Sequence, residues 1–193
     1  MSEKEKDQLS EKEQQELLEK YDAESKTRNV KGKLYHVIFL GLIAFSVFQL
    51  YTGIFGQLTA YLQRTIHLGF ALSLIFLLFP AARGMKKDKI PWYDYILMLL
   101  SILVCGYWPV YYDTLVQQFG GISVMQMIVG GLAILLVLEA ARRAVGLPIT
   151  IIALLFLGYA LLGPNIPGMF AHAGLSLEQL IQSMFFTTEG ILG

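Results

Sequence analysis

The chain has 193 residues, of which 55% are hydrophobic and 16% are charged, with basic and acidic side chains in equal number. Soluble domains average roughly 45–50% apolar and roughly 25% charged residues. Residues 1–33 hold 17 of the 30 charges, so only 13 remain for the other 160 residues. So few charges cannot cover the surface of a soluble domain of that size, and the soluble globular class is excluded.

Charge and cysteine content exclude further classes. Outside positions that flank apolar segments there is no basic cluster interleaved with aromatic residues, so no nucleic-acid partner is expected. Cys105 is the only cysteine, which excludes intramolecular disulfides and cysteine-based metal sites. A cleavable signal peptide would need its apolar core near about residue 10–20. Residues 1–33 are polar instead, so the first apolar segment is expected to be an uncleaved anchor.

Residues 1–33 are predicted to form a polar cytoplasmic tail. Residues 1–28 are rich in Glu, Lys and Gln, and Ser10 and Glu13 have the spacing of a capping box, which predicts a solvated helix. The stripe of Leu17, Leu18 and Tyr21 is too thin to sustain a coiled coil.

Five apolar segments follow, and each is predicted to cross a membrane as a helix. The first has 22 residues without a charge, about 33 Å of helix against a hydrocarbon core of about 30 Å. Aromatic residues at both ends of the third segment are expected to anchor it in the two interfaces. The predicted spans are residues 34–55, 66–82, 91–110, 122–138 and 149–162, and the aromatic clusters are Trp92, Tyr93 and Tyr95, and Tyr107, Trp108, Tyr111 and Tyr112.

A different pattern covers residues 175–193. Ser176 and Gln179 form a capping box, and apolar residues recur at the spacing of a one-faced helix. This amphipathic helix is expected to lie along the membrane surface or to lead into a further segment. Because no charged tail follows it, the sequence is expected to be a truncated piece of a longer chain.

Basic residues predict the orientation. Ten of the eleven basic residues near the spans lie on one side, and only Arg64 lies on the other. The positive-inside rule therefore predicts a cytoplasmic N-terminus, with residues 117–121 and 164–174 outside.

The most polar cluster of the apolar region is Glu139 with Arg142 and Arg143, at the i+3 and i+4 spacing of a helical ion pair. A helix end closed by a local ion pair is the favoured interpretation, and a site for an anionic lipid or an intersubunit contact is the alternative. A metalloprotease site is not indicated, because only one glutamate and no nearby histidine are present.

The remaining candidates are isolated. His36, His67 and His172 are expected to be hydrogen-bonding anchors, and Asp94, Asp113 and Glu178 are expected to stay hydrated at span ends or in loops. No Asp, Glu, Lys or Arg lies in the middle of a span, so no ion or substrate pathway is indicated. Gly130 and Gly131 are predicted to allow close helix packing, with a half-helix break as the alternative. We predict no enzyme, and no catalytic, cofactor-binding or metal-binding residue.

Four blocks in order resemble a known family. Residues 64–71 (RTIHLGFA), 138–148 (LEAARRAVGLP), 161–168 (LLGPNIPG) and 187–193 (TTEGILG) are similar to the N-terminal part of fused permeases of tripartite ATP-independent periplasmic (TRAP) transporters, in the branch that works with TAXI solute-binding proteins. The resemblance covers residues 34–193 and excludes the tail.

The resemblance implies a secondary active permease in the bacterial or archaeal cytoplasmic (inner) membrane. Residues 34–146 would be its four-helix scaffold, residues 147–168 a linking helix with an outer turn, and residues 169–193 the start of the large region. That large region would move small organic acids with Na⁺ by an elevator motion. The implied partners are the lipid bilayer, the large permease region and a TAXI-type binding protein. No family binding residue falls on this sequence. The alternative is a stand-alone structural or accessory membrane protein that assembles with a separate permease.

Overall fold

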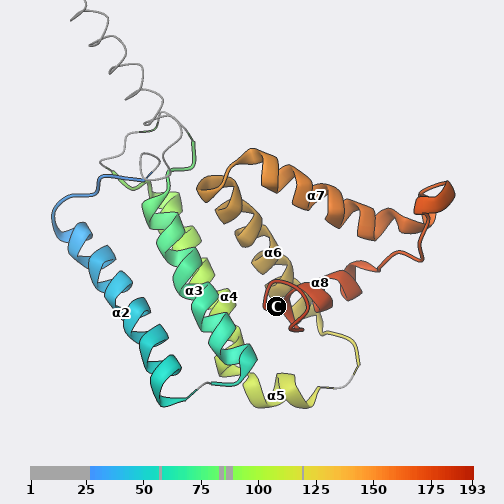
Figure 1. Ribbon diagram of the computed structural model, residues 1–193, viewed down its shortest axis with the longest axis horizontal. Coiled ribbons are helices and arrows are strands. Elements are labelled where there is room, and N and C mark those ends of the chain that lie inside the picture. Colours follow the sequence, from blue (N-terminus) through green and yellow to red (C-terminus); the bar gives the residue numbers. More distant parts are fainter. Residues whose placement is uncertain (1–26, 57, 83–84, 86–88, 119) are drawn as a thin grey trace, which may run out of the picture.

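The computed structural model describes residues 27–193 apart from residues 57, 83–84, 86–88 and 119, and the described chain is all-helical. Five helices are long and apolar enough to cross a membrane, so the chain is a multi-pass membrane protein and the predicted fold class is confirmed. The helix predicted around Ser10 and Glu13 lies outside the described residues. The long helices are α2 (Lys33–Phe55), α3 (Ala60–Leu78), α4 (Trp92–Val110), α6 (Val124–Ala144) and α7 (Leu147–Leu162) (Figure 1). The shorter elements are α5 (Tyr112–Gln117), α8 (Leu177–Phe185) and the 3-10 turns Gly163–Asn165 and Gly168–Phe170.

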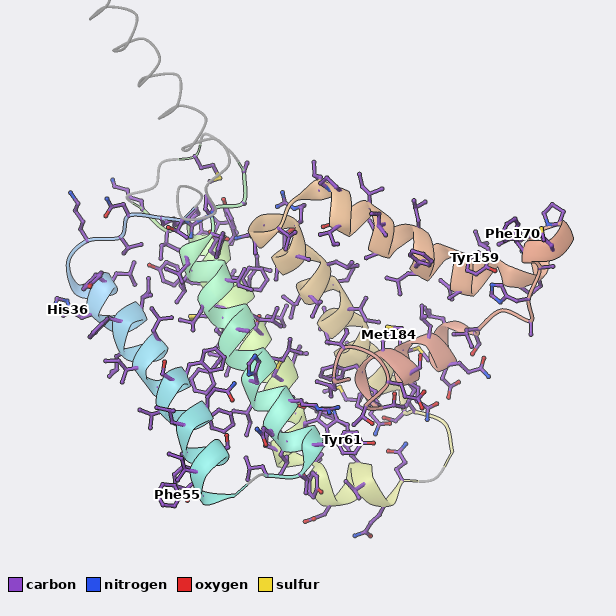
Figure 2. The ribbon with its side chains drawn as sticks, in the orientation of Figure 1. His36, Phe55, Tyr61, Tyr159, Phe170 and Met184 are labelled. Atoms are coloured by element: carbon purple, nitrogen blue, oxygen red, sulfur yellow. The ribbon has the colours of Figure 1, made fainter. Side chains whose placement is uncertain are left out.

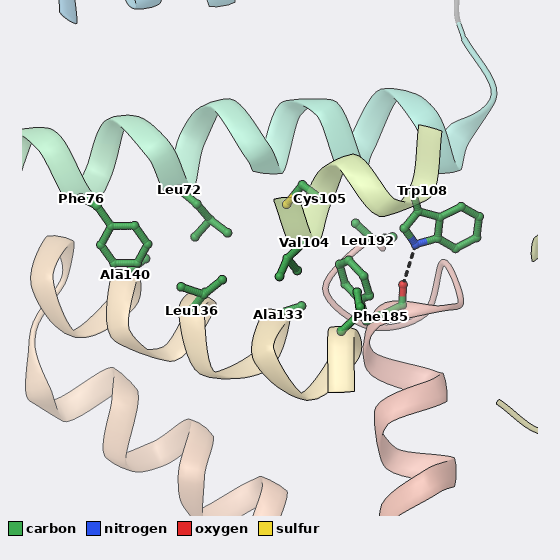
Figure 3. Close-up of a cluster of buried hydrophobic side chains, with 11 residues drawn as sticks. Leu72, Phe76, Val104, Cys105, Trp108, Ala133, Leu136, Ala140, Phe185 and Leu192 are labelled. Atoms are coloured by element: carbon green, nitrogen blue, oxygen red, sulfur yellow. Dashed lines mark hydrogen bonds between the residues drawn. The ribbon is translucent and has the colours of Figure 1, made fainter. Parts of the chain in front are cut away.

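Helices α3, α4 and α6 form the centre of the bundle, and α2 and α7 lie at its two sides (Figure 1). In the core, Ala133 and Ala140 on α6 let the backbone approach the larger side chains of the neighbouring helices. The side chains of Leu72 and Phe76 come from α3, and Val104 and Trp108 come from α4 (Figure 3). The core is therefore built from helices far apart in the chain.

The two ends of the bundle differ in charge. We call the end at which α2 and α4 begin and α3 and α6 end the basic end. The basic residues described there are Arg28, Lys31, Lys89, Arg142 and Arg143, whereas Arg64 lies near the opposite end.

Three span boundaries differ from the sequence prediction by four residues or more. Helix α3 begins at Ala60 rather than at residue 66. Polar side chains in its first turns form hydrogen bonds to the helix itself. The Thr65 hydroxyl, for example, donates to the Tyr61 carbonyl at 2.6 Å. The same helix ends at Leu78, since Pro80 favours an extended conformation at Phe79 before it. Helix α6 continues beyond residue 138 to Ala144. The six ionisable and small residues after position 138 therefore form its last turns.

The aromatic residue Trp108 is not an interface anchor. It is 2% exposed, stacks on Tyr61 with ring centroids 4.5 Å apart, and donates its indole N–H to the Phe185 carbonyl at 3.2 Å (Figure 3). Trp92 at the basic end is 73% exposed, as expected for an interface aromatic residue. The prediction was wrong for Trp108 because the segment after α8 returns to cover it.

The apolar face of α8 is buried against protein rather than turned to a membrane surface, which corrects the sequence prediction. Leu180, Ile181 and Phe185 are buried, and α8 packs on α6. A Cβ atom on Gly130 would lie 2.5 Å from Cγ2 of Ile181, so glycine is needed at this crossing. Helix α6 runs unbroken through Gly130 and Gly131, so the alternative of a half-helix break is excluded, and close packing is confirmed at Gly130.

Helices α2 and α7 bury little of their surface, with only 11% of each span buried inside the protein. The turn between α6 and α7 depends on Gly146, whose φ of 128° is a conformation that other residues rarely adopt. From this turn α7 diverges from the bundle, and Tyr159 and Phe170 lie far from the core (Figure 2). The apolar surfaces of α2 and α7 are therefore available to lipid or to another protein.

Candidate functional site

The most concentrated polar structure in the described chain is an ionic cluster at the basic end. Asp94, the third residue of α4, has a fully buried side chain between two arginines. Arg28, which precedes α2, pairs with Oδ2 of Asp94, and Arg143 in the last turn of α6 donates to Oδ1 at 2.7 Å. One carboxylate therefore connects the residues before α2 with the start of α4 and the end of α6.

The same arginines contact the end of α3, where buried carbonyls lack partners within the helix. Arg28 Nη1 donates to the carbonyls of Phe76 and Leu77, both at 3.2 Å, and its backbone N–H donates to Leu78 at 2.7 Å. Arg143 lies over the Phe76 ring, with Cζ 5.1 Å from the ring centroid, a cation–π distance. The last carbonyls of a helix lack partners within the helix, so this end of α3 is satisfied by side chains from elsewhere in the chain.

Glu139 extends the cluster toward the surface. Its Oε1 accepts hydrogen bonds from Arg142 Nη2 and Arg143 Nε, each at 2.7 Å, as the i+3 and i+4 spacing predicts. The two arginines nevertheless differ in environment. The Arg143 side chain is 2% exposed and reaches Asp94, whereas the Arg142 side chain is 32% exposed and bonds Glu139.

The electrostatics of the cluster are consistent with the helix dipoles. Asp94 lies in the first turn of α4, where the helix dipole favours a negative charge. Arg28 lies against the end of α3, where the dipole of that helix favours a positive charge.

The cluster is buried, and the Nε atom of Arg28 has no hydrogen-bond partner among the described residues. Breaking a buried pair by removing one member typically costs about 3–5 kcal/mol, because a buried charge is left uncompensated. The arrangement therefore fixes the relative positions of four segments.

The acidic residues have three different environments. Asp113 is exposed, as expected. Glu178 is half-buried and accepts a hydrogen bond from the Ile122 N–H at 3.1 Å, which connects α8 to the turn before α6. Asp94 was expected to be hydrated, and that expectation was wrong because the residues before α2 and the end of α6 both cover it. In the sequence Arg28 counted only as one of the basic residues beside the first span, and its position in a charge-rich tail offered no signal that it would be buried.

The three histidines form hydrogen bonds at separate places, as anchors do. His36 Nδ1 lies 3.1 Å from the Gly32 carbonyl, and His67 bonds Gln49 across the contact of α3 with α2. His172 bonds the Tyr159 carbonyl at 3.0 Å and packs its ring on that tyrosine. Within the described residues, no group of three or more His, Cys, Asp and Glu side chains is placed to hold a metal ion.

Charged side chains in the described spans stay near helix ends. Arg64 is the fifth residue of α3, Asp94 the third of α4, and Glu139 the sixth from the end of α6. The middle sections of the described spans therefore contain no Asp, Glu, Lys or Arg.

Comparisons with protein-family models, with curated proteins and with solved structures find no match to this chain.

Proposed function

We propose that this chain is the membrane scaffold portion of a secondary active, ion-coupled TRAP-type transporter for small organic acids. The coupling ion would be Na⁺, and a TAXI-type extracytoplasmic protein would deliver the solute. The proposal begins from the four sequence blocks that resemble fused TRAP permeases. In it, α2, α3, α4 and α6 are the scaffold helices, and α7 is the helix that links them to the large permease region.

The placement of charge is the observation that carries the proposal. A site for an ion and an organic acid in a bilayer needs polar or charged groups near mid-membrane, commonly at broken helices. In the described spans the charges gather at the ends, and a carboxylate with two arginines connects three helices and the segment before α2. A helix bundle with this distribution of charge is suited to hold a neighbouring region in place and not to bind the solute itself.

The loose attachment of α7 supports the linking role. This helix diverges from the bundle at Gly146, and only 11% of its span is buried. A helix with this little contact has a large apolar surface left for another protein region or for lipid.

Reconstitution tests the proposal. Purified protein in liposomes with an inward Na⁺ gradient is expected to take up none of a panel of labelled carboxylates above empty vesicles. Saturable, Na⁺-dependent uptake by this chain alone would contradict the scaffold role. In the source cell, in-frame deletion of codons 34–193 is expected to abolish Na⁺-dependent accumulation of at least one carboxylate of the panel, and unchanged accumulation of all of them would also contradict it.

The rival function is that of a stand-alone accessory membrane protein. The two functions predict different lengths for the polypeptide that the cell makes. An epitope tag inserted in the chromosomal gene at residues 118–121 detects that polypeptide on a denaturing gel. A band near the 21.6 kDa of this chain favours the accessory protein, and a much larger band favours the fused scaffold.

A further inference from the structure

An apolar groove runs between α2, α3 and α4. Its volume is about 430 Å³, and α3 and α4 supply most of its lining. Glycine residues widen it on all three helices, at Gly41, Gly69 and Gly106. The polar Ser73 in its wall donates its hydroxyl to the Gly69 carbonyl at 2.6 Å, so that hydroxyl leaves no free hydrogen-bond donor in the groove.

We propose that this groove binds one acyl chain of a membrane phospholipid, held between α2 and the α3–α4 pair. The groove is continuous with the bilayer-facing surface, because Val37 and Ile102 line it and are 60% and 48% exposed. In a membrane this surface meets hydrocarbon. An apolar cavity does not hold water stably, since water there would lack polar partners.

The dimensions of the groove favour an acyl chain. Along α3 the lining runs from Ile66 to Leu77, which at about 1.5 Å per residue is about 16 Å. The volume divided by this length gives a mean cross-section of about 26 Å². A helix about 10–12 Å in diameter has a cross-section of about 80–110 Å², so the groove is too narrow to enclose a whole helix.

The volume also agrees with chain length. A cavity of about 150 Å³ accommodates the six carbons of benzene, about 25 Å³ per carbon. At that density about 430 Å³ has room for about 17 carbons, which is enough for the part of an acyl chain that lies along the groove.

The bound chain would support α2. At the edge of the groove, α2 meets α3 directly through stacked Phe45 and Phe70, with centroids 5.4 Å apart, and through Gly41 against Leu74. Side chains that face an empty groove lose dispersion contacts on that side. An acyl chain restores those contacts and completes the packing of α2 on the bundle.

Lipid retention by a filled-groove variant tests the proposal. A Cβ atom on Gly106 would meet nothing within 4 Å, so Gly106→Phe adds a side chain to the groove without a backbone clash. Its seven carbons would occupy about 175 Å³ of the groove. Gly158→Phe on α7 is the matched control, because a Cβ there also meets nothing within 4 Å and Gly158 does not line the groove.

Wild-type protein and the control, purified in mild detergent, are expected to retain about one phospholipid per chain by mass spectrometry, and Gly106→Phe almost none. Equal retention by both variants would overturn the proposal, as would a free fatty acid in place of the phospholipid.

A second measurement uses the unmodified protein and so does not depend on the folding of a variant. Nanodiscs are made with a phospholipid that carries a diazirine near the end of its acyl chain, and cross-linked peptides are mapped after irradiation. Cross-links are expected to concentrate on the groove residues of α3 and α4. A distribution no denser there than around the exposed Leu155 and Phe156 of α7 would contradict the proposal.

Discussion

Replacement of Asp94 by Asn tests the ionic cluster directly. Asn preserves the size of the side chain and one carbonyl oxygen, but it removes the charge that lies between Arg28 and Arg143. All three side chains are at most 2% exposed, so the two guanidinium groups would remain buried without their counter-charge. The expected loss is about 3–5 kcal/mol of unfolding free energy. That is roughly a hundred- to several-thousand-fold in the unfolding equilibrium, at about 1.4 kcal/mol per tenfold.

The assay is reversible unfolding by SDS in mixed micelles, carried out in a Trp92→Phe background so that the fluorescence comes from buried Trp108 alone. This indole lies at the opposite end of α4 from Asp94, so its signal reports loss of the bundle and not a local change at the basic end. The midpoint of the SDS titration is expected to fall strongly for Asp94→Asn.

Arg142→Gln is the matched control. It removes the partly exposed pair with Glu139 on the same helix end, and exposed pairs at this spacing contribute only about 0.3–0.5 kcal/mol. The double variant Asp94→Asn/Arg143→Gln is expected to lose less stability than the sum of its single variants, because the second change removes one uncompensated charge. A loss for Asp94→Asn as small as that for Arg142→Gln, or strict additivity in the double variant, would refute the argument.

Two further predictions concern topology and packing. The topology is tested with single cysteines in a background without the native cysteine, at the exposed positions 89 and 118. An impermeant thiol reagent applied to intact cells is expected to label Gln118→Cys but not Lys89→Cys. The reverse pattern would overturn the predicted orientation. Gly130→Ala places a Cβ atom 2.5 Å from Ile181 Cγ2 and is expected to cost about 1–3 kcal/mol in the SDS titration. Gly131→Ala, whose Cβ would lie 3.9 Å from Cδ1 of the same residue, is expected to be neutral or to add up to about 1 kcal/mol, and equal losses at both positions would contradict the packing of α8 on α6.

The spans were predictable because length and hydrophobicity are local properties of the chain. The start of α3 was misplaced by six residues, since polar residues such as Arg64 and Thr65 resembled a loop in sequence. The Thr65 hydroxyl bonds back to the preceding turn, which removes most of the cost of placing it in a helix. The start of α6 has a local signal in the sequence, the capping box of Ser123 and Gln126, which places the first helical residue at 124 rather than at 122.

The ionic cluster was not predictable in the same way, because its members are distant in sequence. Arg28 and Asp94 are 66 residues apart, and Arg143 is a further 49 residues along the chain. A carboxylate at a span end is ordinarily hydrated, so only the path of the chain before α2 could show that Asp94 is covered. The Glu139 pairs were predicted because three and four residues separate the partners on one helix.

The two ends of the bundle are held by different interactions, and this limits which helices can move. At the basic end, charge connects α3, α4 and α6. Near the other end, the hydrogen bond from Trp108 to the Phe185 carbonyl connects α4 to the end of α8, and the hydrogen bond from Arg64 to the Leu192 carbonyl at 2.6 Å connects α3 to the segment after α8. Displacing α3, α4 or α6 would break buried polar contacts at one end or the other. Helix α7 has no such constraint, because little of it is buried and its turn is set by Gly146. If the chain is the scaffold of an elevator-type transporter, α3, α4 and α6 would stay fixed, and α7 is the helix that could adjust to a moving neighbour.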